Sequence, residues 1–196
     1  AQATVAGARE KVAALVGARD PASIIFTSGA TESNNIAVRG TALRNQKMGK
    51  RVVTSAIEHI SVLNPAKDLQ KNGFTFTQVP VDRFGVIDLD ALAAAVMPET
   101  VVTSVHYANN EIGTIEPIRE VAEIVHDRGG FLHVDATDAA GRIPIDVERD
   151  GIDLLTLSSN QLGGPDGVGA LYIRPGVRVQ PVIVGGGQEL GLRPGT

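Results

Sequence analysis

The segment FLHVDATDAAG, at residues 131–141, joins a short apolar run of strand length to a loop of small and acidic residues. Six further apolar runs of similar length lie along the chain, and segments with the spacing of amphipathic helices alternate with them. The predicted strands are 23–27, 51–55, 74–79, 101–106, 131–135, 154–158 and 169–173. The predicted helices are 5–16, 31–44, 60–72, 89–96 and 117–128. Strands that alternate with helices indicate βαβ units, so we expect an α/β fold in one domain, a seven-stranded, mostly parallel sheet with helices on both faces.

The charge and composition disfavour several classes of function. The 196 residues include 18 Lys and Arg against 22 Asp and Glu, so we expect neither nucleic-acid binding nor attraction to an anionic membrane. No apolar run approaches the roughly 18 residues of a membrane span, which favours a cytoplasmic protein. The absence of Cys excludes disulfides, thiolate metal sites and a cysteine nucleophile from these residues. All five Lys lie within the first 71 residues.

The residues after each predicted strand are candidates for a site, because ligands of open parallel sheets bind beyond the carboxyl ends of the strands. After the first strand comes SGATES, at residues 28–33. Gly29 permits a tight turn, Thr31 is a suitable N-cap, and the free N–H groups of a helix start attract anions. The sequence predicts a phosphate-binding loop here, with an ordinary capped turn as the alternative.

Two further loops carry polar groups suited to a flat ligand. His59 follows the strand 51–55, where an imidazole can stack on a cofactor or carry a proton, or simply cap the next helix. Asn109 and Asn110 follow the strand 101–106, where amides can hold a ligand oxygen or form a turn.

Asp135 ends its strand at an edge where a carboxylate is poorly solvated without a cationic partner. A protonated pyridine nitrogen would supply that partner, and a carboxylate that caps the next loop is the alternative. Metal binding by His133, Asp135 and Asp138 is disfavoured, because Asp138 lies in the loop beyond the strand face that the other two share; we predict no metal. Ser158 ends a later strand, before a Gly- and Pro-rich loop suited to a phosphate or to a turn.

Several motifs occur in register along the chain: FTSGATESNN, IEH, NNEIGTI, HVDAT, GPDGVGALYIR and GGGQE followed by RPGT. In this order and spacing they resemble the cysteine desulfurases, members of the class V aminotransferase group with the fold type I architecture for pyridoxal 5'-phosphate. The resemblance implies that residues 1–196 form the cofactor-binding large domain, without the family's small domain and catalytic cysteine loop. It also implies removal of sulfur from L-cysteine, giving L-alanine and a persulfide for iron–sulfur cluster assembly. The resemblance further implies a homodimer that binds a sulfur acceptor protein or an iron–sulfur scaffold protein.

The resemblance assigns the cofactor phosphate to residues on several loops. Ala30 and Thr31 would hold it at the start of a helix, and Ser158 would be a further ligand. Thr196 would reach the phosphate of the neighbouring subunit's cofactor.

The resemblance also assigns contacts with the pyridine ring. His59 would stack on the ring and assist proton transfer, as the catalytic residue. Asn110 would contact the ring hydroxyl. Asp135 would pair with the pyridinium nitrogen and keep it protonated, so that the ring can accept electrons.

The chain departs from the family pattern around one site. The family has a His-Lys pair where this sequence has Asn160 and Gln161, and that lysine forms the Schiff base with the cofactor. A carboxamide nitrogen is not nucleophilic, so Gln161 marks a lost Schiff-base position. Asp138 stands where the family usually has a glutamine that contacts the ring oxygen, and an added carboxylate should weaken the binding of a phosphorylated cofactor.

These departures predict a cysteine desulfurase homologue that is impaired or inactive and binds pyridoxal 5'-phosphate noncovalently or not at all. One alternative is a noncatalytic sulfur-transfer or iron–sulfur assembly platform. Another is an active desulfurase that receives a lysine, or a preformed cofactor–amino acid imine, from elsewhere. Two further alternatives are another class V enzyme, such as a selenocysteine lyase, and an interaction module that keeps the fold without small-molecule chemistry.

Overall fold

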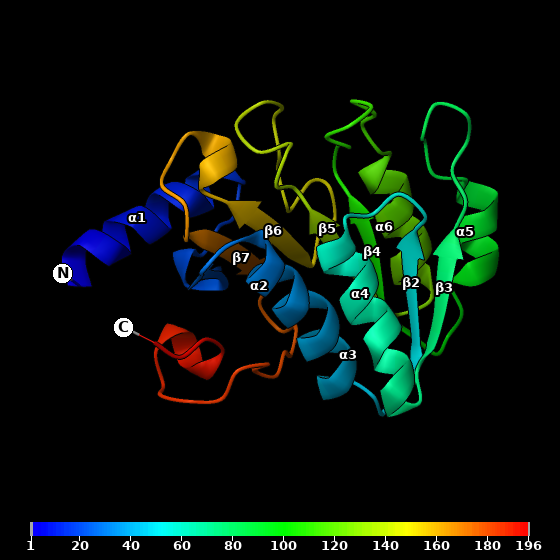
Figure 1. Cartoon of the computed structure of the whole chain (residues 1–196), viewed down its shortest axis with the longest axis horizontal. Helices are drawn as coiled ribbons and strands as arrows, with labels where there is room; N and C mark the ends of the chain where they lie inside the picture. The colour runs from blue at the N-terminus through cyan, green and yellow to red at the C-terminus, as the bar shows by residue number, and fades with distance from the viewer. Residues whose placement is uncertain (1, 196) are drawn as a thin grey trace.

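A seven-stranded sheet forms the centre of the molecule in the computed structural model, which describes residues 2–195 (Figure 1). The strand order is β1-β7-β6-β5-β4-β2-β3, and β7 runs antiparallel to both of its neighbours while all other pairs are parallel. The strands are β1 Ile24–Thr27, β2 Arg51–Ser55, β3 Thr75–Val79, β4 Thr100–His106, β5 Phe131–Asp135, β6 Leu154–Ser158 and β7 Gly169–Ile173. The predicted α/β fold with a mostly parallel sheet is therefore confirmed, and every predicted strand is present within one residue of its expected bounds.

The α-helices are α1 Gln2–Leu15, α2 Ala30–Asn35, α3 Thr41–Arg44, α4 Ile60–Asp68, α5 Leu89–Ala95 and α6 Ile118–Asp127. The helix predicted at 31–44 is present as one helical path, in which a π-helical turn, Ile36–Gly40, lies between α2 and α3. Gly40 lies against the C-terminal segment there, and its carbonyl oxygen accepts a hydrogen bond from Gln180 N at 3.2 Å. A Cβ atom at Gly40 would lie 2.5 Å from the Gln180 carbonyl oxygen, so the close approach requires glycine.

Alternate side chains of each strand pack against helices on opposite faces of the sheet. On one face, Val53 and Leu155 belong to a buried cluster that includes residues of α1, α5 and α6. On the other face, Val52 packs with α3 and α4, and Leu154 packs with the turn 36–40. Figure 1 shows α2, α3 and α4 in front of the sheet and α6 behind it, which confirms the prediction of helices on both faces.

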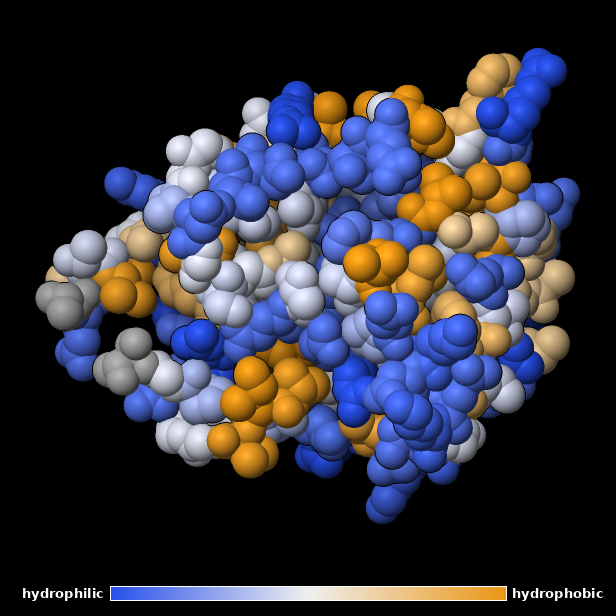
Figure 2. Space-filling model, viewed as in Figure 1, coloured by the Kyte–Doolittle hydropathy of each residue, from blue (hydrophilic) through white to orange (hydrophobic). Residues whose placement is uncertain are grey.

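The surface in the same view is mostly hydrophilic, with hydrophobic residues in separate patches (Figure 2). Among the described residues, none of the helices combines the length and the apolar character that a membrane span requires.

The loop between β1 and α2 lies directly on the start of β7. Gly29, the N-cap of α2, has a φ of 151°, a backbone conformation that favours glycine. A Cβ atom at Gly169 would lie 2.6 Å from Gly29 Cα and 2.8 Å from Thr27 Oγ1. Because Gly169 has no side chain, the first turn of α2 can approach the sheet this closely.

Three ionisable side chains are buried together where β2 and β4 end. Glu58 Oε1 accepts hydrogen bonds from Ser55 Oγ at 2.5 Å and from His106 N at 2.8 Å. His106 Nε2 lies 3.6 Å from Glu116 Oε1, while Glu116 Oε2 accepts a hydrogen bond from Ile87 N at 2.9 Å. Burial raises the pKa of Glu58 to about 7. Burial alone would lower the pKa of His106, but the carboxylates of Glu116 and Glu58 outweigh it and raise that pKa.

Replacing Gly169→Ala is expected to destabilise the protein by about 2 kcal/mol, because the added methyl group must displace backbone atoms of Gly29. Urea unfolding measures the change. Gly7→Ala is the matched control, since a Cβ atom there meets nothing within 4 Å on a helix and the change should be neutral or stabilising. Equal stability of the two variants would contradict the close packing of the loop on β7.

The buried Glu58 is expected to make stability fall as the pH rises. The folded state holds its proton up to a pKa of about 7, whereas the unfolded carboxyl has a pKa of 4.5, so the free energy of unfolding decreases as the pH rises from 4.5 through 7. Glu58→Gln keeps the hydrogen-bonding shape without the titration and should remove this decrease, which amounts to about 3 kcal/mol between the two pKa values. Denaturant unfolding across this range measures it, with the exposed Glu120→Gln as control; an unchanged slope in Glu58→Gln would refute the assignment.

Candidate functional site

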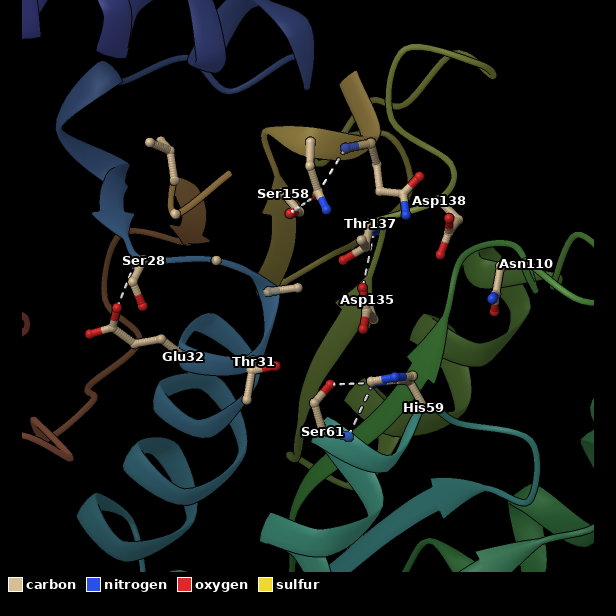
Figure 3. A pocket seen from close by; sticks show the side chains of 16 residues that line it. Ser28, Thr31, Glu32, His59, Ser61, Asn110, Asp135, Thr137, Asp138 and Ser158 are labelled. Atoms are coloured by element: carbon tan, nitrogen blue, oxygen red, sulfur yellow. Dashed lines mark hydrogen bonds between the residues drawn. The ribbon is translucent and has the colours of Figure 1, made fainter. Parts of the chain in front are cut away.

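A pocket of about 390 Å³ opens at the carboxyl ends of β1, β5 and β6 (Figure 3). This is the edge at which parallel sheets bind ligands, and the volume is in the range of small-molecule sites. The lining residues are Ser28, Gly29, Ala30, Thr31, Glu32, His59, Ser61, Asn110, Asp135, Thr137, Asp138, Ser158, Asn160, Gln161, Gly167 and Val168.

The pocket brings together the predicted site residues of the described chain. Those that line it are Ala30, Thr31, His59, Asn110, Asp135, Asp138, Ser158 and Gln161. Thr196 lies outside the described residues, so its predicted contact with a neighbouring subunit stays a prediction.

The first turn of α2 forms one wall of the pocket. The N–H groups of Ala30 and Thr31 lie in the first turn, where a helix has no internal acceptors for them. Glu32 shapes the preceding loop, because its Oε2 accepts a hydrogen bond from Ser28 N at 2.5 Å while its Oε1 lies 3.1 Å from Arg193 Nε. Burial alone would raise the pKa of Glu32, but the contacts with Ser28 and Arg193 outweigh it and lower that pKa.

A chain of hydrogen bonds joins His59 to Asp135 across the floor of the pocket. His59 Nδ1 caps α4 by accepting from Ser61 N at 3.1 Å, and it lies 2.7 Å from Ser61 Oγ. Asn34 Nδ2 donates both to Ser61 Oγ and to Asp135 Oδ2, each at 2.8 Å. Thr137 N donates to Asp135 Oδ1 at 3.0 Å. Both oxygens of the Asp135 carboxylate are therefore held in place.

Sequence reasoning missed Asn34 and Ser61. Asn34 is fully buried on α2, three residues after Thr31, and Ser61 is two residues after His59. Each lies within one helical turn of a predicted site residue, and this short spacing along the helix is the sequence signal that could have indicated them. The hydrogen bonds of Asn34 with Asp135 and with Ser61 depend on packing between distant segments.

The two neighbouring asparagines have different surroundings. Asn109 Oδ1 accepts hydrogen bonds from Glu111 N at 2.9 Å and Ile112 N at 3.1 Å, which is turn chemistry. Asn110 lines the pocket. The loop after β4 thus uses one amide for its own structure and presents the other to the cavity.

The departures from the family pattern lie together on one side of the pocket. Gln161 is in a 3₁₀ turn, Asn160–Leu162, and its Oε1 accepts a hydrogen bond from Arg142 Nη2 at 3.2 Å. Arg142 Nη1 lies 3.6 Å from Asp138 Oδ1. Asn160 Oδ1 accepts a hydrogen bond from Ser158 Oγ at 2.5 Å, so that hydroxyl is already engaged.

His133 has a structural role. It is fully buried in β5, with Nδ1 2.7 Å from Ser104 Oγ and Nε2 3.0 Å from Thr156 Oγ1. Burial lowers the pKa of His133 to about 4, so the imidazole is neutral. Within residues 2–195 no group of three or more acidic, His or Cys side chains is arranged to hold a metal ion.

The sequence and the fold match those of known proteins. The chain is 53% identical over 196 residues to "Cysteine desulfurase IscS 1" of Archaeoglobus fulgidus, covering 100% of this chain and 51% of the relative. The solved structure titled "NIFS-LIKE PROTEIN" superimposes with a TM-score of 0.93 at 43% identity, over 97% of this chain and 53% of that one. "SspA in complex with cysteine" matches with a TM-score of 0.91 at 40% identity, over 96% and 55%.

The chain spans about half the length of the relatives it matches. A family model described as "Aminotransferase class-V" matches residues 1–192, nearly the whole sequence. This match agrees with the fold and with the position of the pocket at the strand ends. The chain therefore belongs to the aminotransferase class-V family.

Proposed function

We propose that the pocket binds pyridoxal 5'-phosphate without a covalent link, and that the chain is the cofactor-binding part of a cysteine desulfurase-type protein. The observation that carries the proposal is the gathering of Ala30, Thr31, His59, Asn110, Asp135 and Ser158 around one cavity at the strand ends. The names of the matched relatives support the same activity.

The residues present fit the cofactor. Thr137 Oγ1 is buried and has no hydrogen-bond partner among the described residues, so the pocket offers a polar atom that a ligand can satisfy. The N–H groups at the start of α2 and the hydroxyl of Thr31 suit a phosphate. Asp135, held on both oxygens, suits a protonated ring nitrogen.

Each side chain then has a distinct task. Asp135 keeps a proton on the ring nitrogen, because an ionised carboxylate favours a positively charged partner. His59 covers the ring, and because its Nδ1 is occupied by Ser61, its Nε2 is the atom available to hold or move a proton. Asn110 orients the ring hydroxyl. The cofactor, when bound, supplies a ring that accepts the electron pair from a substrate carbon.

The amine that would fix the cofactor is missing from the pocket. Gln161 lines the cavity where the family has its lysine, and within residues 2–195 no Lys lines it. A carboxamide does not attack an aldehyde, so binding is noncovalent. We therefore propose impaired removal of sulfur from L-cysteine, in a homodimer that meets a sulfur acceptor protein. A noncatalytic sulfur-transfer platform is the second candidate, favoured by the engagement of Ser158 with Asn160.

Titration of the purified protein with pyridoxal 5'-phosphate is expected to give a saturable absorbance change that dialysis removes. Asp135→Asn should weaken this binding at least about tenfold, since it loses a charge-assisted contact. The exposed Asp127→Asn is the control and should bind normally. After borohydride treatment the unaltered protein should gain no mass, and full-length protein should release alanine from L-cysteine more slowly than its Gln161→Lys variant does. Attachment of the cofactor to a Lys would refute noncovalent binding, and no binding at all would refute the proposal.

Gln161→Lys is expected to restore covalent attachment, because it places an amine on the pocket wall. Mass spectrometry after borohydride reduction should show one added cofactor per chain. Gln161→Met has similar length and no amine, so it should bind cofactor and gain no mass. Binding without attachment in Gln161→Lys would show that position 161 does not face the reactive carbon.

A further inference from the structure

The pocket has an acidic lining. Its lining holds the carboxylates of Glu32, Asp135 and Asp138, and within residues 2–195 it holds no Lys or Arg. Glu32 is paired with Arg193 at 3.1 Å. Asp135 accepts a hydrogen bond on each oxygen. Of the three carboxylates, Asp138 therefore has the weakest pairing.

Arg142 lies beside Asp138 but forms no close ion pair with its carboxylate. Its Nη1 donates to the Asp138 carbonyl oxygen at 3.1 Å and remains 3.6 Å from the carboxylate, while its Nη2 donates to Gln161 Oε1. The Arg142 side chain is 57% exposed, so water screens its charge. Burial and the neighbouring charge of Asp135 raise the pKa of Asp138. A cation placed beside this carboxylate would therefore be bound favourably.

We infer that the pocket selects the amine form of the cofactor, pyridoxamine 5'-phosphate, over the aldehyde form, with Asp138 and the Gln161 carbonyl oxygen accepting hydrogen bonds from its ammonium group. The inference rests on the proposed function, since it places the phosphate near Thr31 and Ser158. Figure 3 shows these two residues across the cavity from Asp138. Asp138 and Gln161 lie together, because both contact Arg142.

Charge complementarity supports this selection. A ligand with a phosphate at one end and an ammonium group at the other matches an anion-binding helix start facing an acidic wall. Asp135 then meets the positive ring nitrogen, and Asp138 meets the ammonium. The neutral aldehyde gains no attraction from Asp138, and at Gln161 it finds no amine to trap it covalently.

Equilibrium dialysis of the full chain against three ligands tests the inference. Pyridoxamine 5'-phosphate carries the ammonium group, pyridoxal 5'-phosphate carries the aldehyde, and pyridoxine 5'-phosphate has the shape of the amine without its charge. The amine is expected to bind at least about tenfold tighter than either of the other two. A difference in affinity between the amine and the alcohol measures the contribution of the charge, because the two ligands have similar shapes.

Two variants locate the effect. Asp138→Gln removes the charge and keeps hydrogen-bonding capacity, so the preference for the amine should fall below about threefold while the affinity for the alcohol does not decrease. Asp166→Asn removes the same charge from a loop residue that does not line the pocket, and should keep the full preference.

The outcomes separate the two proposals. Equal binding of the three ligands, or tighter binding of the aldehyde, overturns the selection of the amine and leaves noncovalent cofactor binding intact. A preference that survives Asp138→Gln overturns the role of Asp138. Failure of all three ligands to bind overturns the proposed function and this inference together.

Discussion

The hydrogen bond from Asn34 Nδ2 to Asp135 Oδ2 is the contact on which the pocket depends. It joins α2, which carries the turn proposed to bind the phosphate, to the end of β5, which carries the central carboxylate. The same amide nitrogen reaches Ser61, and through it His59 at the start of α4. One buried amide therefore links three elements, and the Asp135 carboxyl group can lie at this depth because each of its oxygens accepts a hydrogen bond.

Sequence patterns predicted the sheet well, because each strand is a short apolar run whose burial alone selects an extended conformation. Asp135 and His59 could be predicted because Asp135 ends one strand and His59 follows another, at the edge where open parallel sheets bind ligands. The π-helical turn inside the helix 31–44 was not predicted, nor was the hydrogen bond that its residue Gly40 accepts from Gln180, far along the chain. The same holds for the contact of Arg142 with Gln161, which joins two loops that only the folded sheet brings together, whereas its contact with Asp138 spans four residues of one loop.

Donors and carboxylates occupy partly separate walls of the pocket. The first turn of α2 carries N–H donors without internal acceptors, and its lining carboxylate, Glu32, is paired with Arg193, whereas Asp135 and Asp138 lie on β5 and the loop after it. A lysine at position 161 would supply both a nucleophile and a positive charge, and Gln161 supplies neither, so the proposed site differs from a lysine-bearing one in charge as well as in reactivity. A class V scaffold can thus keep its ligand geometry while the balance among ligand forms shifts.

The contact between Arg193 and Glu32 bears on the order of assembly during synthesis. Glu32 organises the loop before α2, yet its cationic partner lies 161 residues later. Gly169, on which that loop rests, also comes late. Because a chain emerges from the ribosome amino end first, the strands can begin to pair while this wall of the pocket still lacks its partners. A nascent chain should therefore gain its ligand-binding surface only after nearly all of this segment has been released.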